Sequence, residues 1–446
     1  RPQACDGVAD NNEDLDMMWN DALRSFAADL AARFDSLETS RPRPLAILTN
    51  NAADYFESLN GTMHEYFPSG HSGIDYGNPY DYNWWQEMFQ YPGGYLVSPF
   101  NTSPYVVKVL NAEARVVNND LSRHVQTANF ERHKRFCLVS ALLGDGYLSL
   151  DAGHLGHGSL WWEPEYDHAG RGTGYLGMPL GPPQRLLQAT GSQVLGDPGF
   201  DAIDSPWKAE PFDAVGTYTL DTTEFVSAPS AARIDISAAP GPSAFKVWQP
   251  GIALEADVTY TLRFRARADQ GLVLRLWLSS PDCPSTRCLF EHAYALPMQW
   301  TLFETSFTSS ATTQVSLDMF LDSIGTVWLD DFELREGDTR LFRRDFDNGI
   351  VLLNVTPETR SIDLEQTYHR LGIPMSDVFD GQAINSETLA ASDGRILLRD
   401  PPTDWPPPDD DPSDVIDPRN QTLLLPVRPN PFTTGTQIAF LSLIHI

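Results

Sequence analysis

Two hydrophobic patterns alternate in the first part of the chain. Short apolar runs predict buried strands at 5–11, 45–51, 61–67, 105–112 and 145–153. Apolar residues at helical spacing predict helices at 14–37, 80–90 and 128–144. Strands that alternate with helices at this interval are typical of βα units around a parallel sheet. A doubly wound sheet and a (β/α)8 barrel both fit this period, and in either fold the functional residues follow the strands.

The pattern changes at about residue 191. From there to residue 338 apolar and polar residues alternate in short runs, at 232–237, 245–249, 259–268, 272–279, 300–309, 314–321 and 326–336. A period of two over many short runs predicts an antiparallel β-sandwich. Residues 339–399 contain further short runs separated by turns and predict a small all-β domain.

Length and charge narrow the class of protein. The chain has 446 residues, too many for one compact core, so the sequence predicts a multidomain protein. Its 31 Lys and Arg face 60 Asp and Glu, a net charge of −29, which excludes nucleic acid and anionic membranes as favoured partners. No eighteen consecutive apolar residues occur, so no membrane span is expected. Among polymeric partners, a carbohydrate remains once nucleic acid and anionic membranes are disfavoured. The sequence does not fix an oligomeric state.

Polar residues follow the predicted strands of the first region, where a sheet of this kind binds its ligand. Carboxylates accept hydrogen bonds from sugar hydroxyls, and flat rings stack on the C–H faces of pyranoses. The candidates for contact with a saccharide are Asp6, Asp10, Asn50, Asn51, Glu65, Asp151, Trp161, Trp162 and Glu165. No Gly-rich phosphate loop opens a predicted helix, so no cofactor is expected for catalysis.

Three segments of the alternating region carry a resemblance. LGDPGFD (195–201), YTLRFRARA (260–268) and TVWLDDFEL (326–334) resemble the carbohydrate-binding jelly-roll modules attached to many glycosidases. The resemblance implies a structural calcium bound partly by a carboxylate of the last strand, which points to Asp330 or Asp331. Trp207, Trp248 and Trp277 are candidates for a sugar platform, of which we take Trp248, whereas Trp328 is expected to be a core aromatic.

Cysteine usage adds one local prediction. Cys283 and Cys288 lie five residues apart in a loop between two strand-like runs and predict a small disulfide in an oxidising compartment, with a pair of free thiols as the alternative.

A second resemblance concerns the segments on either side of the sandwich. DGVADNN (6–12), NGTMHEYF (60–67), WWEPEYD (161–167), YLGMPLGPP (175–183) and RRDFDNGIVLLNVTP (343–357) resemble bacterial glycosyl-hydrolase-like TIM barrels. The resemblance implies that residues 1–190 are the C-terminal part of a (β/α)8 barrel whose N-terminal third is missing. Residues 339–399 would complete the barrel protein, and 191–338 would be an inserted module.

Glycoside hydrolysis requires one carboxylic acid to protonate the leaving oxygen and a second carboxylate as nucleophile or base. Glu65 is the candidate general acid and Asp10 the candidate nucleophile or base, with Asp6 as the rival of Asp10. Further rivals, favoured as substrate contacts or loop residues, are Asp151, Glu163, Glu165 and Asp167. The structural alternatives are a helix cap for Asp10 and a rim salt bridge for Glu65. The sequence therefore predicts a glycoside hydrolase acting on a polysaccharide or oligosaccharide, and the alternative is a non-catalytic glycan-binding surface protein.

The end of the chain bears on location. Residues 400–419 form a linker rich in Pro and Asp, which prevents regular pairing and extends the chain. Residues 420–440 resemble the start of a type IX secretion-type tail or an immunoglobulin-like domain, which implies a secreted or cell-surface bacterial protein. Residues 441–446, LSLIHI, match one reading frame of a sequencing adapter, with a genuine apolar strand as the alternative, and no functional residue is expected there.

Overall fold

The computed structural model describes part of the chain. The described residues are 48–50, 61–67, 107–113, 128–151 without 145, 164–168, part of 22–33, and 174–400 without 203, 240–244, 271, 281–289, 322 and 373–379. These residues divide into two compact units. Residues 185–342 form what we call the sandwich unit, and the described residues before 185 and after 342 form the flanking unit.

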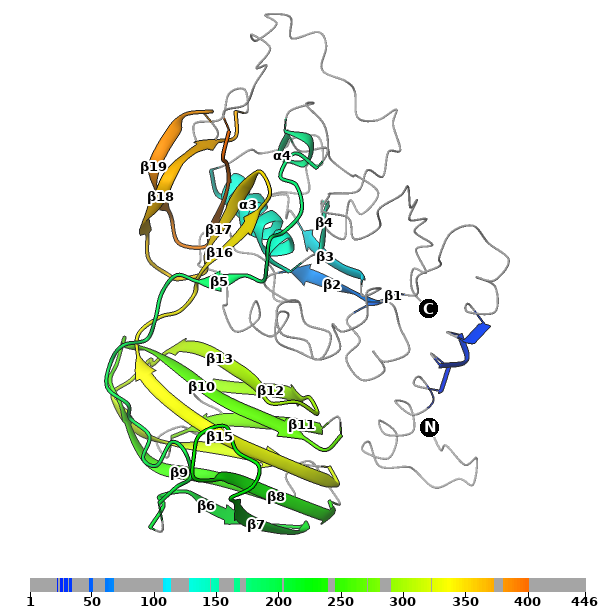
Figure 1. Cartoon of the computed structure of the whole chain (residues 1–446), viewed down its shortest axis with the longest axis vertical. Coiled ribbons are helices and arrows are strands. Elements are labelled where there is room, and N and C mark those ends of the chain that lie inside the picture. Colours follow the sequence, from blue (N-terminus) through cyan, green and yellow to red (C-terminus); the bar gives the residue numbers. More distant parts are fainter. Residues whose placement is uncertain are drawn as a thin grey trace, which may run out of the picture. The chain divides into compact units, whose positions relative to one another are not determined.

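The sandwich unit consists of two five-stranded antiparallel sheets (Figure 1). The first sheet has the order β13-β10-β15-β8-β7, with strands β7 (Val215–Asp221), β8 (Ala231–Ala238), β10 (Thr259–Ala268), β13 (Thr301–Thr308) and β15 (Gly325–Glu336). The second has the order β12-β11-β14-β9-β6, with strands β6 (Lys208–Glu210), β9 (Phe245–Leu254), β11 (Leu272–Ser279), β12 (Phe290–Leu296) and β14 (Thr313–Leu321). The jelly-roll-like sandwich predicted for this region is therefore present.

Strand alternation builds the core of the sandwich unit. In β11 the four leucines at 272, 274, 276 and 278 are buried, while the residues between them are half-buried on the outside. Aromatic rings fill the centre, where Phe264 stacks on Phe332 at 4.8 Å and meets the edge of Tyr294 at 5.0 Å. Trp207 also lies in this core, and its indole N–H donates to the Asp197 carbonyl at 2.9 Å.

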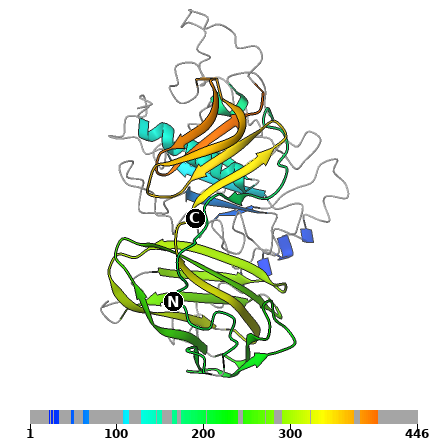
Figure 2. The same cartoon turned by 60° about the vertical axis from the view of Figure 1, so that its left-hand side comes forward.

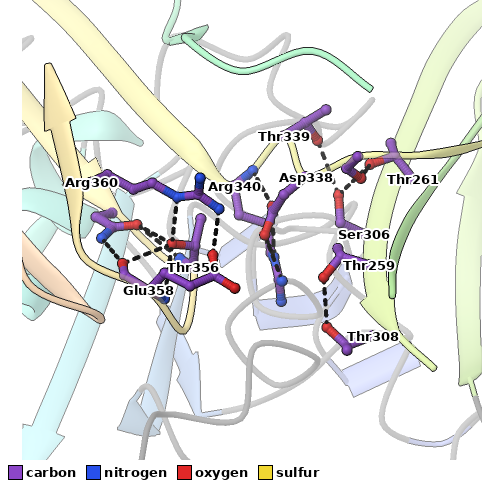
Figure 3. Close-up of polar contacts among 12 residues, drawn as sticks. Thr259, Thr261, Ser306, Thr308, Asp338, Thr339, Arg340, Thr356, Glu358 and Arg360 are labelled. Carbon is purple, nitrogen blue, oxygen red and sulfur yellow. Dashed lines mark hydrogen bonds and ion pairs between the residues drawn. The ribbon is translucent and has the colours of Figure 1, made fainter. Parts of the chain in front are cut away.

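Hydroxyl groups join the strands where β15 leaves the sandwich (Figure 3). The Thr259 and Thr308 hydroxyls are 2.9 Å apart, and a buried chain links Thr261 to Ser306 at 2.8 Å and Ser306 to Thr339 at 3.1 Å. Just beyond, the buried Arg340 guanidinium donates to both carboxylate oxygens of Asp338. These contacts fix the last residues of the sandwich unit.

The flanking unit contains one parallel and one antiparallel sheet. The parallel sheet has the order β1-β2-β3-β4, with strands β1 (Leu48–Asn50), β2 (Gly61–Phe67), β3 (Val107–Glu113) and β4 (Tyr147–Asp151). The antiparallel sheet has the order β19-β18-β20-β17-β16-β5, with strands β5 (Gln184–Arg185), β16 (Leu341–Phe346), β17 (Gly349–Asn354), β18 (Arg360–Arg370), β19 (Ala383–Leu389) and β20 (Asp393–Leu398). The helices are α3 (Ala128–Leu143) and α4 (Pro164–Asp167), and the described residues within 22–33 are helical.

The predicted (β/α)8 TIM barrel is wrong. The described residues are mostly strand and form three antiparallel sheets and one parallel sheet of four strands. The βα pattern correctly indicated the four parallel strands, but it did not show how many strands join the sheet or whether they close. Closure depends on pairing between residues far apart in the sequence, which a local hydrophobic period does not encode.

Helix α3, which precedes the sandwich in the sequence, packs on strands β17 and β20, which follow it (Figure 2). Arg135 of α3 makes a two-pronged contact with Asp393 of β20, with N–O distances of 2.8 and 3.0 Å, and both side chains are buried. Gly394 allows this approach, because a Cβ there would lie 2.8 Å from the Arg135 carbonyl oxygen. Arg344 of β16 donates to the carbonyls of Leu142 and Leu143 at the end of α3. The segments before and after the sandwich therefore share one folded unit.

Replacing Asp393 with Ala should destabilise the flanking unit by about 3–5 kcal/mol, because the buried Arg135 and Arg395 would lose the carboxylate that balances them. Hydrogen exchange of peptides from α3 and β20, measured against urea concentration, reports this unit alone. The control is Glu358→Ala, which removes an exposed carboxylate paired with Arg360 and should cost less than about 1 kcal/mol (Figure 3). Equal losses for the two variants would contradict the importance of the buried pair.

Candidate functional site

One outer surface of the sandwich unit gathers aromatic and charged side chains. It lies on the sheet β12-β11-β14-β9-β6, and alternation directs every second residue of its strands away from the core. We call this surface the aromatic face and define it by Lys246 and Trp248 of β9, Trp277 of β11, and Asp318 and Phe320 of β14.

Strand register places these five residues in two neighbouring rows. In one row Trp277 is opposite Asp318, and Asp318 is opposite Trp248. In the next row Phe320 is opposite Lys246. The rings of Trp277 and Phe320 are 4.2 Å apart at an interplanar angle of 42°. The Lys246 ammonium lies 5.0 Å from the Trp248 ring centre and 5.3 Å from that of Phe320, within the range of cation–π attraction.

Asp318 is the buried anchor of the aromatic face. It is 4% exposed although it points away from the core, because its neighbours on the face cover it. The Ser316 hydroxyl donates to Oδ1 at 2.6 Å, the Ser279 hydroxyl donates to Oδ2 at 2.7 Å, and the Lys246 ammonium lies 3.1 Å from Oδ1. A buried carboxylate with three donors is well satisfied, so Asp318 holds Lys246 between the two rings.

This arrangement suits a flat ligand that has both apolar and polar groups. Trp248 and Trp277 are half-buried, so neither residue is closed off from solvent. Indole rings stack on apolar C–H surfaces, and an ammonium held at a fixed place donates hydrogen bonds to oxygen atoms. Pyranose rings offer both kinds of surface.

The outer surface of the other sheet has a different character. Trp328 of β15 is 8% exposed and lies under two guanidinium groups, with Arg267 at 4.5 Å and Arg233 at 5.3 Å from its ring. Its indole N–H donates to Asp221 at 3.0 Å, and this hydrogen bond, with those from Thr223, holds the pKa of Asp221 well below its usual range. Trp328 is thus buried, as predicted from the sequence, but beneath a layer of arginines.

The predicted calcium ligands Asp330 and Asp331 do not fit the ion. Oδ2 of Asp330 accepts from the backbone N–H groups of Val226 and Ser227, and Oδ1 accepts from the Ser227 hydroxyl and the Asp331 N–H. Asp331 points to Arg265, at 3.6 Å. Calcium needs oxygen atoms with free lone pairs, whereas each Asp330 oxygen already accepts two hydrogen bonds and Asp331 is paired with Arg265. Within the described ranges no group of three His, Cys, Asp or Glu could hold a metal ion, so calcium stays a prediction without a ligand set.

Three residues that the sequence predicts to contact a saccharide lie in strands of the flanking unit, which give the positions of their backbones. Asn50 ends β1, Glu65 lies near the end of β2, and Asp151 ends β4. Because the four strands are parallel and neighbours in one sheet, these positions lie toward the end of the sheet formed by the carboxyl ends of the strands.

Glu165 of α4, predicted to contact a saccharide, is buried and forms an ion pair within the protein. It is 2% exposed, and its carboxylate lies 2.9 Å from the ammonium of the equally buried Lys134 of α3. Several other candidates lie outside the described residues, namely Asp6, Asp10, Asn51, Trp161, Trp162, Cys283 and Cys288.

The sequence interpretation missed Lys246, Asp318 and Phe320. The signal was present, because the alternation in FKVWQ (245–249) puts Lys246 and Trp248 on the same side, and that in QVSLDMFL (314–321) does the same for Asp318 and Phe320. What the sequence lacked was the adjacency of β9, β14 and β11, which brings these residues together with Trp277.

Comparisons with known proteins concern about a third of the chain. Three similar structures are a CBM4 module, the CBM22-1 xylan-binding domain from Paenibacillus barcinonensis Xyn10C, and the N-terminal cellulose-binding domain of Cellulomonas fimi β-1,4-glucanase C. Their sequence identities are 22%, 9% and 24%, and their TM-scores are 0.27, 0.28 and 0.26. They cover 32%, 33% and 32% of this chain and 99%, 97% and 97% of their own. At these scores the likeness carries no functional argument. No protein-family model and no curated protein matches the chain.

Among the described residues, no helix has both the length and the apolar character needed to cross a membrane.

Asp330→Asn should destabilise the sandwich unit by about 2–4 kcal/mol, because in either orientation of the amide its NH2 group would face a backbone N–H donor, that of Asp331 or those of Val226 and Ser227. The neighbouring Asp331→Asn is the matched control, since Asp331 is more exposed and makes a long ion pair, and Asn tolerates its φ of 54°. Hydrogen exchange of peptides from β15 and the loop after β7 measures both. If the two variants are equally stable, the hydrogen bonds from Val226 and Ser227 to Asp330 do not hold the loop after β7 in place.

Proposed function

We propose that this protein binds a carbohydrate polymer on the aromatic face of its sandwich unit. The observation that supports the proposal is the grouping of Trp248, Trp277 and Phe320 around a lysine that a buried carboxylate holds in place. Stacking rings supply affinity for the faces of sugar rings, and fixed polar groups supply orientation. The resemblance of residues 195–201, 260–268 and 326–334 to carbohydrate-binding modules supports the same function.

The proposal includes a location outside the cell, either secreted or at the cell surface, because a polysaccharide of high molecular mass is met there. It is confined to binding. Asp10 lies outside the described residues, Glu65 is placed only by its backbone, and the barrel expected to bring them together is not present in the described part of the chain. Hydrolysis by Asp10 and Glu65 stays a prediction from sequence.

Trp248→Ala and Trp277→Ala should each weaken glycan binding by about 2 kcal/mol, roughly thirtyfold in Kd, because each removes a ring on which a sugar stacks. Affinity electrophoresis of the full chain in gels that contain soluble neutral or acidic polysaccharides measures the change. Circular dichroism should show that both variants keep their fold, since both side chains point away from the core.

The control is Phe225→Ala, which removes an aromatic side chain, 37% exposed, from the loop that follows β7 of the other sheet. It should bind like the wild type. If the wild-type chain is not retarded by any polysaccharide of the panel, the proposed function is wrong. If it is retarded but neither tryptophan matters, the binding surface lies elsewhere.

A further inference from the structure

The polar groups of the aromatic face are unevenly divided between donors and acceptors, and this division bears on the kind of sugar bound. Among the five residues that define the face, the carboxylate is Asp318, which is 4% exposed, and both of its oxygens already accept from Ser279, Ser316 or Lys246. It has little capacity left for a sugar hydroxyl. Lys246, whose side chain is 18% exposed, has three N–H donors and no acceptor.

Two further cations lie on the same surface. Arg275 of β11 is opposite Phe320 in the register and alternates with the buried Leu274 and Leu276, so it points outward in the row of Lys246. Lys208 of β6 is exposed and opposite Trp248. Phe320 thus has a cation on each side along its row. On the edge strands, Glu210 of β6 is exposed and opposite Lys246, and Glu291 of β12 is opposite Trp277, so an acidic position lies at one end of each row and the cations Lys246 and Arg275 lie nearer the centre.

On the central strands β9, β11 and β14 this surface has two cations, Lys246 and Arg275, against the buried Asp318, whereas in the chain as a whole acids outnumber bases by 60 to 31. A neutral sugar presents hydroxyl groups that both donate and accept, so a matching surface supplies acceptors as well as donors. A uronate carboxylate only accepts, and its pyranose ring still has C–H faces for stacking. The Lys246 ammonium, about 5 Å from two ring centres, is near enough to pair with the carboxylate of a sugar stacked on the face.

We infer that the aromatic face selects an acidic polysaccharide, whose uronate carboxylates pair with Lys246 while its sugar rings stack on Trp248 and Trp277. This inference rests on the proposed function and narrows it to a class of ligand. Recognition of this kind weakens as salt increases, because Lys246 and Arg275 lie at a solvent-accessible surface where ions screen their charge.

The test compares two polymers that differ only in charge. The probes are polygalacturonate and the same polymer after reduction of its carboxyl groups to primary alcohols, and titration calorimetry measures their binding to the full chain. The wild type should bind polygalacturonate about tenfold more tightly than the reduced polymer at low ionic strength. This preference should shrink when salt is raised from about 0.05 to about 0.5 M.

Three variants assign the preference to Lys246. Lys246→Met should lose the tenfold preference, and Lys246→Arg should keep most of it because the positive charge remains. Arg263→Met removes the same charge from the outer surface of the other sheet, where the Arg263 side chain is 46% exposed, and should leave the preference unchanged. Wild-type circular dichroism spectra for all three variants would show that folding is not the cause.

The remaining outcomes separate the inference from the proposed function. Equal or tighter binding of the reduced polymer, or of neutral polysaccharides alone, would overturn the uronate inference and leave carbohydrate binding intact. An unchanged preference in Lys246→Met would overturn the role of Lys246. Failure of the wild type to bind either polymer or any polysaccharide of the panel would overturn the proposed function itself.

Discussion

Alternation of side chains along β-strands is the constraint on which the sandwich unit depends. A strand that packs Phe245 and Val247 into the core must point Lys246 and Trp248 outward, and the same holds for Met319 and Leu321 against Asp318 and Phe320. A register shift by one residue would bury Lys246 and expose Val247. The aromatic face and the hydrophobic core are therefore fixed by the same pairing, and neither can change without the other.

The buried carboxylate of Asp318 fixes the side chains on the aromatic face. Exposed lysines usually sample many rotamers, and an ion pair at a fully exposed site stabilises little. Lys246 differs because its partner Asp318 is itself immobilised by two serine hydroxyls and covered by neighbouring rings. A preorganised donor of this kind loses less conformational entropy when a ligand binds. The rings contribute the same advantage, since they are packed against one another before any ligand arrives.

The flanking unit shows how a chain can leave a domain and return to it. Helix α3 precedes the sandwich in sequence and strands β16 and β20 follow it, yet Arg135, Asp393 and Arg344 join them through buried hydrogen bonds. Burying Arg135 requires a partner, and the partner comes from more than two hundred residues away. This unit can therefore form its core only after both segments of the chain are available.

The sequence by itself determined the local elements. The alternating runs at 259–268 and 272–279 are the strands β10 and β11 to the residue, and the helical spacing of 128–144 is helix α3, because these patterns repeat over a few residues. Only the tertiary structure decided what the strands build. It showed that β1 to β4 do not extend into a barrel among the described residues, that Trp207 is in the core while Trp248 and Trp277 are outside, and that Asp330 holds a loop. These features depend on which strands become neighbours. Packing between residues that are distant in the chain determines the neighbours, and a local hydrophobic period does not predict that packing.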